Sequence, residues 1–238
     1  MTMGGNFVIA GGSKGIGLEL VNQLMPIADR IDVISRSHGQ LVDHEKVVRH
    51  TMDFTAPNLD FSEIPDVVHG VVYCPGTINL RSFRALKPAD FVADFEVNLV
   101  GAVKFLQGCL PALKKGATEQ TSSVVMFSTV AASQGLSMHA SVAAAKGAVE
   151  GLTRSLAAEW APKIRVNCIA PALTDTPLAS RFFSSPENCE AMAAKYPLGR
   201  TGLPTDLAST ARFLLTSESS WMTGQVLAVD GGMSTVRK

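Results

Sequence analysis

The chain has 238 residues, of which 46% are hydrophobic and 18% are charged, which suits one α/β domain with a large core and excludes a disordered chain. Lys plus Arg and Asp plus Glu number 21 each, so the formal net charge is zero and no basic excess exists to attract nucleic acid. No apolar run is long enough for a signal sequence or a membrane span, so we expect a cytoplasmic protein without a membrane partner.

The cysteines do not form a C-x-x-C pair, and none has a histidine at the spacing of metal ligands. We therefore expect reduced thiols that pack as small hydrophobic side chains, and no metal site. The four residues concerned are Cys74, Cys109, Cys168 and Cys189.

Short apolar stretches of strand length alternate with longer helical stretches along the chain. Strands are predicted over 6–10, 31–35, 46–52, 67–74, 123–127, 165–169 and 225–229. Helices are predicted over 16–25, over 88–115 in two pieces that meet near Asn98, and over 137–160. This β-α-β alternation predicts an α/β fold, a Rossmann-type doubly wound parallel sheet with helices on both faces, in a single domain over 1–238.

The stretch from 174 to 203 breaks the alternation, because it holds several prolines and short helical pieces such as 187–195. In a doubly wound sheet, ligands bind beyond the carboxyl ends of the strands. An irregular excursion after the sixth strand is therefore expected to be a substrate lid.

Glycines gather where the first predicted strand meets the first helix, in the pattern Gly11-x-x-x-Gly15-x-Gly17. Residues without a Cβ let backbone N–H groups approach a pyrophosphate, and the helix N-terminus adds partial positive charge. We expect this loop, with Ser13 and Ile16, to bind a dinucleotide; the alternative is an ordinary tight turn.

The end of the second strand indicates which dinucleotide binds. An NAD site normally has an acidic residue there, but this chain has Ser35 followed by Arg36. A guanidinium can hold a 2′-phosphate, and Lys14 could add a second cation, so NADP(H) is favoured over NAD(H). Arg36 could instead be a plain surface residue. Asp53, followed by Phe54, is either an adenine contact or a turn aspartate.

With these residues in view, the chain resembles the short-chain dehydrogenase/reductase family along nearly its whole length. That family has a Rossmann domain with a seven-stranded parallel sheet. The matching segments are Gly11-xxx-Gly15-Ile-Gly17, Asp53, Val97-Asn98-Leu99-Val100-Gly101, Phe127-Ser128-Thr129-Val130-Ala131, Ala145-Lys146-Gly147-Ala148-Val149, Ile164-Arg165-Val166-Asn167, Pro171, Thr176 and Val229-Asp230-Gly231-Gly232.

The resemblance implies a role for each matching site residue. The glycine loop would hold the pyrophosphate, Arg36 the 2′-phosphate, and Asp53 with Phe54 the adenine. Gly76 would lie near the adenosine ribose, Lys146 on the nicotinamide ribose and Thr176 near the carboxamide. Asn98 would orient a helix kink and a water of the proton relay, and members of the family are commonly tetramers that use helices such as 98–115 and 137–160.

The chain departs from the family at the residue that normally donates the proton. The family has a tyrosine four residues before the lysine, and this chain has Val142, which can neither donate nor accept a proton. The serine that holds the carbonyl corresponds to Thr129, beside Ser128, so a hydroxyl is kept. The family's Asn-Asn-Ala-Gly segment is also altered, to Tyr73-Cys74-Pro75-Gly76.

Other groups could replace the missing phenol. His139 lies seven residues before Lys146, on the same helix face and about 10 Å along the axis at 1.5 Å per residue. The enoyl reductase branch of the family has a tyrosine at that spacing, and histidine is a natural proton donor. The alternatives are that His139 only packs at the helix start, or that Ser141 or a water held by Asn98 and Lys146 donates.

The remaining candidates are the two tyrosines. Tyr73 could reach the cofactor and Tyr196 could fold over it, but packing or lid roles are favoured for both.

Two functions remain open on the sequence alone. The first is an NADP(H)-dependent oxidoreductase that acts on a carbonyl or an activated C=C bond of a small molecule. The second is a dinucleotide-binding protein without turnover, a sensor or a subunit that supports an active relative. The kept Lys146, Asn98 and Thr129 favour the first, and Val142 favours the second. A homo-oligomer, tetramer or dimer, is expected in either case.

Overall fold

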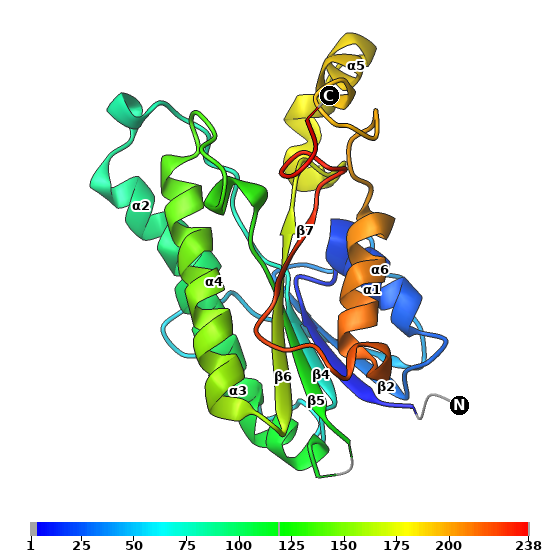
Figure 1. Cartoon of the computed structure of the whole chain (residues 1–238). Coiled ribbons are helices and arrows are strands. Elements are labelled where there is room, and N and C mark those ends of the chain that lie inside the picture. Colours follow the sequence, from blue (N-terminus) through cyan, green and yellow to red (C-terminus); the bar gives the residue numbers. More distant parts are fainter. Residues whose placement is uncertain (1–3, 119, 238) are drawn as a thin grey trace.

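Seven parallel strands form one sheet in the order β3-β2-β1-β4-β5-β6-β7 in the computed structural model, which describes residues 4–118 and 120–237 (Figure 1). The sheet confirms the predicted doubly wound topology. Its strands are β1 (Asn6–Ala10), β2 (Arg30–Ser35), β3 (Val47–Thr51), β4 (Gly70–Tyr73), β5 (Ser122–Phe127), β6 (Ile164–Pro171) and β7 (Val226–Val229).

The central strands end level with one another. Ala10 of β1 pairs with Tyr73 of β4, and Tyr73 pairs with Met126 of β5. Because the strands are parallel, the segments that follow them leave the sheet at the same edge. The glycine loop, residues 74–77 and residues 128–129 are therefore brought together there.

Helices cover both faces of the sheet (Figure 1). On one face lie α1 (Gly15–Leu24) and α6 (Pro204–Leu215), packed against each other over a core that includes Leu20, Val21 and Leu207. On the other face lie α2 (Pro88–Phe95), α3 (Gly101–Gly116) and α4 (Ala140–Trp160). Short 3₁₀ turns lie at Phe83–Ala85, Val130–Ala132, Pro177–Phe183 and Ser217–Ser219.

The predicted helix over 88–115 is interrupted where two pieces were expected to meet. One turn of π-helix, Glu96–Val100, joins α2 to α3 and holds Asn98, which is fully buried. π-Turns inside α-helices are often found at functional sites, because the extra residue redirects side chains. Here the turn directs Asn98 towards the ends of β4 and β5.

Helix α6 was missed by the sequence analysis, although its pattern is regular. Its buried residues Leu207, Ala208, Ala211, Leu214 and Leu215 recur at helical spacing, and Pro204 stands at the first position. Most boundaries differ by one or two residues, and two differ by three. Strand β4 begins at Gly70 rather than at 67, and α4 begins at Ala140 rather than at 137 because Met138 has a positive φ of 68°.

The excursion over 174–203 lies beyond the carboxyl ends of the strands, where it forms the upper part of the molecule in Figure 1. It contains the 3₁₀ turn Pro177–Phe183 and α5 (Pro186–Ala193). A single β-bridge between Thr174 and Gly202 joins its two ends. The excursion therefore leaves and returns to the sheet at one point.

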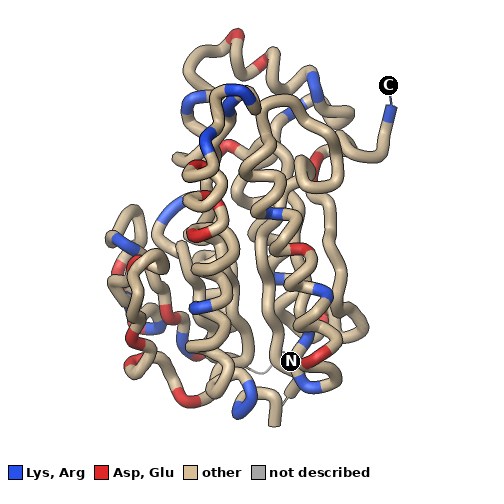
Figure 2. Tube along the Cα trace, turned by 90° about the vertical axis from the view of Figure 1, so that its left-hand side faces the viewer, with Lys and Arg blue, Asp and Glu red and all other residues tan. Residues whose placement is uncertain are grey.

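Charged residues of both signs are mixed along the trace (Figure 2). Within the described residues, no helix is long and apolar enough to cross a membrane. No group of three or more His, Cys, Asp or Glu residues in the described chain is placed to hold a metal ion.

Candidate active site

A cavity of about 520 Å³ opens at the carboxyl edge of the sheet. It runs from Ile16 in the glycine loop to the excursion over 174–203. Most of its wall is apolar, formed by residues that include Leu80, Val130, Leu136, Val142, Leu173, Leu178, Phe182 and Met192. A few polar groups point into an otherwise apolar space, as is typical of small-molecule sites.

The glycine loop has a backbone that only glycine adopts readily. Gly11 and Gly15 have φ values of +77° and +55°, which lie in the left-handed region. A Cβ on Gly17 would clash with the carbonyl oxygen of Gly11. A Cβ on Gly15 would lie 3.3 Å from the Thr176 methyl group, so the loop and the start of the excursion face each other closely across the cavity edge.

The cations proposed to bind a 2′-phosphate lie on the surface. Arg36 and Lys14 are both exposed, and Lys14 directly precedes α1. Asp53 accepts hydrogen bonds from the backbone N–H (3.0 Å) and hydroxyl (2.8 Å) of Thr55. These bonds, helped by the charge of Arg36, lower the pKa of Asp53. The Phe54 side chain packs in the core against Tyr73 and Phe105, so only its backbone is available to a ligand.

Lys146 is buried at the inner end of the cavity. Its Nζ donates a hydrogen bond of 2.8 Å to the carbonyl oxygen of Phe127. Burial lowers its pKa to about 8, against the opposing effect of Cys168, Cys74 and Asp94. A Cβ on Gly76 would lie 3.2 Å from both Lys146 Nζ and Asn98 Oδ1. Gly76 therefore leaves a small polar cradle open beside the lysine.

Asn98 is held by a hydrogen-bonded group that includes two residues absent from the sequence analysis. Its Nδ2 donates to Thr77 Oγ1 (2.9 Å) and to the backbone oxygen of Asp94 (2.7 Å). Thr77 Oγ1 in turn donates to Asp94 Oδ1 at 2.6 Å. The Asp94 side chain lies four residues before Asn98, on the same helix face, and that spacing was the signal that could have found it.

The hydroxyls that follow β5 differ in availability. Ser128 Oγ donates to Glu150 Oε1 (2.8 Å) and to the Lys146 carbonyl oxygen (3.3 Å), so its proton is used inside the protein. Thr129 Oγ1 accepts from the backbone N–H of Ala131 (3.3 Å), which leaves its proton free. Both residues line the cavity. Thr129 is therefore the better donor to a substrate oxygen.

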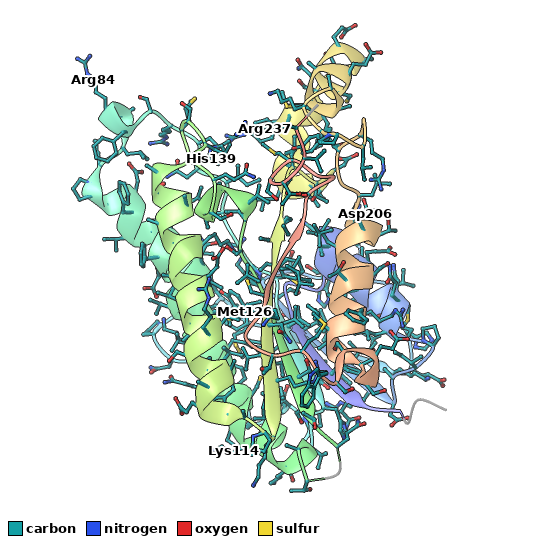
Figure 3. The ribbon with its side chains drawn as sticks, in the orientation of Figure 1. Arg84, Lys114, Met126, His139, Asp206 and Arg237 are labelled. Carbon is teal, nitrogen blue, oxygen red and sulfur yellow. The ribbon has the colours of Figure 1, made fainter. Side chains whose placement is uncertain are left out.

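The start of α4 carries the candidates for proton donation. His139 lines the cavity and lies at the N-terminal end of α4 (Figure 3). Its Nδ1 lies 2.7 Å from the carbonyl oxygen of Ser137; since a carbonyl only accepts, Nδ1 carries a proton and Nε2 remains for a ligand. Val142 lines the cavity, whereas Ser141 is fully buried and is not among the cavity-lining residues.

The two tyrosines have structural contacts. Tyr73 lies in the core and donates its hydroxyl proton to the carbonyl oxygen of Val97 at 2.7 Å, and burial raises its pKa. Tyr196 lines the cavity and accepts a hydrogen bond from the Leu173 N–H at 3.2 Å. The packing role predicted for Tyr73 is confirmed, and Tyr196 anchors the excursion to the end of β6.

The chain is similar to many proteins of one family. Residues 19–234 match the sequence profile described as enoyl-(acyl carrier protein) reductase. The 2-(S)-hydroxypropyl-CoM dehydrogenase 3 of Xanthobacter autotrophicus is 28% identical, with 96% of each chain covered. A tropinone reductase homologue of Arabidopsis thaliana is 32% identical over 95% of this chain and 89% of its own.

The fold is likewise shared with solved structures. A short-chain dehydrogenase/reductase of Brucella melitensis, named as a glucose/ribitol dehydrogenase, superposes with a TM-score of 0.87 at 25% identity. That superposition covers 99% of this chain and 98% of the other.

Proposed function

Because this chain belongs to the short-chain dehydrogenase/reductase family of oxidoreductases, we propose that it transfers hydride between NADP(H) and a carbonyl or activated C=C bond, with a proton donor other than tyrosine. The observation that carries the proposal is the position of Lys146, buried beside Gly76 and Asn98 at the inner end of an apolar cavity. The alternative of a binding protein without turnover gains no support, since the relatives are named as dehydrogenases and reductases.

The residues present fit a nicotinamide dinucleotide. A Cβ on Gly15 would contact Thr176, and a Cβ on Gly17 would clash with Gly11. The loop therefore needs glycine at both positions, and its bare backbone suits a ligand that approaches closely. Asn98 Oδ1 is buried and accepts no hydrogen bond from the described residues, and it borders the cradle beside Gly76. We propose that the glycine loop, with Ser13 and Ile16, holds the pyrophosphate.

Lys146 would bind the nicotinamide ribose in that arrangement. Gly76 and Asp53 would lie along the adenosine part of the cofactor, and Thr176 near the carboxamide. Each of these contacts is testable by the loss of affinity that its removal causes.

NADP(H) is favoured over NAD(H) by the charges at the end of β2. Ser35 has a hydroxyl in place of the carboxylate of an NAD site, and this hydroxyl donates to the Ser37 carbonyl oxygen. Arg36 is exposed and without an ion pair among the described residues, so its guanidinium is available to a 2′-phosphate. Lys14 at the start of α1 would add a second cation.

The chemistry of the chain's own residues follows from their protonation. The bound nicotinamide would supply or take up the hydride. Thr129 would donate a hydrogen bond to the substrate oxygen and so orient the carbonyl. The Lys146 ammonium would stabilise the negative charge that develops on that oxygen. A proton must still reach the oxygen, and Val142 cannot supply it.

The substrate side of the cavity favours an apolar small molecule. Leu178 and Phe182 of the excursion, with Leu136 and Val142 opposite, offer contact area but no buried charge. We propose that the excursion over 174–203 acts as a lid that selects the substrate.

We also propose a homo-oligomer, either a dimer or a tetramer. Large apolar side chains are fully or mostly exposed at Phe83, Val92 and Trp221, which is typical of covered surfaces. Light scattering at micromolar concentration would give the mass directly.

Turnover is the test of the proposed function. Oxidation of NADPH is followed with a panel of apolar ketones, β-ketoacyl thioesters and enoyl thioesters, with Lys146→Ala as control. We expect turnover that the control loses, together with tighter binding of NADPH than of NADH in a fluorescence titration. A protein that binds neither dinucleotide would overturn the proposal at its base.

A further inference from the structure

Thr77 and Asp94 form a hydrogen-bonded pair at the inner end of the cavity, in which Thr77 is partly buried and Asp94 is buried. Thr77 lines the cavity, and its Oγ1 donates to Asp94 Oδ1 at 2.6 Å, a short distance for a bond to a carboxylate. Asp94 is only 3% exposed. No Lys, Arg or His side chain forms an ion pair with it among the described residues. A buried carboxylate without such a pair needs a reason to be there.

The hydrogen bonds of this pair are incomplete on the side of Asp94. Its Oδ2 is buried and accepts no hydrogen bond from the described residues, and the same holds for Asn98 Oδ1. Lys146 is the charged group that faces them, close enough for Asp94 to act on its pKa. A buried carboxylate with one unused oxygen, whose other oxygen bonds to a hydroxyl at the cavity wall, has the parts of a proton relay.

We propose that Thr77 transfers the proton to the substrate oxygen in this protein, and that Asp94 is the positioning residue that supplies it through the Thr77 hydroxyl. This inference rests on the proposed function, because it names the group that replaces the phenol absent at Val142. Asn98 holds Thr77 by a bond to its oxygen, which leaves the threonine proton free to point either to Asp94 or to the cavity.

The transfer balances in protons and electrons. As hydride reaches the carbonyl carbon, the O–H bond of Thr77 breaks and its proton forms a bond to the substrate oxygen. The O–H bond of protonated Asp94 breaks at the same time, and that proton bonds to Thr77 Oγ1. The alcohol leaves, and Asp94 remains as a carboxylate that accepts from Thr77. A hydronium ion from solvent returns the proton by the reverse path and leaves as water. In alcohol oxidation, the carboxylate is the base.

Position favours Thr77 over His139 for this step. Thr77 follows Gly76, on which a Cβ would lie 3.2 Å from Lys146 Nζ, and it bonds to Asn98. His139 stands seven residues before Lys146, about 10 Å along the helix axis. A donor to an oxygen held by Lys146 and Thr129 must lie within hydrogen-bond reach of it.

The test compares variants in two backgrounds, the natural Val142 and Val142→Tyr. Thr77→Val removes the hydroxyl but keeps the shape of the side chain, and Thr77→Ser keeps the hydroxyl. Asp94→Asn keeps an oxygen that accepts from Thr77 but has no carboxyl group to carry the relayed proton. Thr153→Val is the matched control. Thr153 is a buried residue of α4 outside the cavity wall, and its hydroxyl donates to the backbone oxygen of Val149 at 2.8 Å. Steady-state kinetics, NADPH dissociation constants and melting temperatures are measured for each.

We expect Thr77→Val and Asp94→Asn to lower kcat about 10²-fold or more in the Val142 background, the lower range for general acid catalysis. Thr77→Ser should restore most of the rate, and NADPH affinity should not change. In the Val142→Tyr background the phenol supplies the proton, so the same substitutions should cost only a few-fold.

Three results would overturn the relay. An equal loss in both backgrounds would give Thr77 and Asp94 a structural role only. Full activity of Thr77→Val, with activity lost in His139→Phe, would place the donor at His139. If the natural protein is inactive and the Val142→Tyr variant is active, the relay proposal fails but the proposed cofactor site stands. If both proteins are inactive, the proposed function itself is overturned.

Discussion

Replacing Lys146 by Met should change how stability depends on pH, and the size of the change follows from burial. The pKa of Lys146 falls from 10.5 to about 8 in the folded chain because burial disfavours the ammonium. Between these two pH values the folded chain binds fewer protons than the unfolded chain, so the free energy of unfolding increases as pH rises. At 1.36 kcal/mol per unit, the charged lysine costs the folded state about 3 kcal/mol at neutral pH.

Methionine has a similar length and carries no charge, so the variant lacks the cost of a buried ammonium at every pH. It also leaves the Phe127 carbonyl oxygen without its donor, at a cost of about 1–3 kcal/mol that does not depend on pH. The informative quantity is therefore the difference between natural protein and variant, measured at pH 7 and again at pH 10. We expect the natural protein to gain about 2.5 kcal/mol relative to the variant over that interval, since part of the cost persists until the pH exceeds 10.5.

Urea unfolding followed by circular dichroism gives both free energies, with matched slopes as the control for two-state behaviour. The comparison also cancels the effect of the Cys109 thiol, whose pKa is raised by burial and which therefore weakens the fold above its ordinary range in both proteins. If the difference in the free energy of unfolding between the two proteins stays constant from pH 7 to pH 10, the conclusion that burial lowers the pKa of Lys146 is refuted.

Three further predictions concern the cofactor and the missing phenol. Val142→Tyr, in a folded variant, should raise kcat for ketone reduction; no gain in the same NADPH-oxidation assay would mean that the cavity has been rebuilt around another donor. Arg36→Leu should weaken NADPH binding about 10-fold or more, the equivalent of one charge-assisted hydrogen bond, with NADH binding unchanged; equal loss for both dinucleotides in the fluorescence titration would contradict the 2′-phosphate role. Gly17→Ala should abolish dinucleotide binding, because its Cβ would meet the carbonyl oxygen of Gly11; unchanged affinity would show that the loop does not carry the pyrophosphate.

The sheet could be predicted because its central strands are buried runs between turn residues, as in Asn6–Ala10, Gly70–Tyr73 and Ser122–Phe127. The break near Asn98 could be expected from resemblance, and the structure gives it as a π-turn. Helix α6 was missed although Leu207, Ala211 and Leu214 repeat at helical spacing, because its alanines and threonines dilute the apolar signal.

The site was harder to predict, because contacts between segments far apart in sequence decide it. Lys146 and Asn98 were named from their motifs, but the sequence does not show that a Cβ on Gly76 would lie 3.2 Å from both Lys146 Nζ and Asn98 Oδ1. Thr77 and Asp94 carry no motif and are 17 residues apart. Their pairing depends on how α2 lies against the end of β4, which only the fold determines. Ser141 failed as a candidate for the same reason, since it is buried away from the cavity.

The hydrogen bond from Tyr73 to Val97 links the hydrophobic core to the proton chemistry. The carbonyl oxygen of Val97, beside Asn98 in the π-turn, accepts a hydrogen bond from the Tyr73 hydroxyl at the end of β4. Gly101 is confined to glycine by the same contact, because a Cβ there would clash with the Tyr73 hydroxyl. Tyr73 and Gly101 are therefore constrained as a pair: a change at either one would turn Asn98 and loosen Thr77, although neither residue lines the cavity.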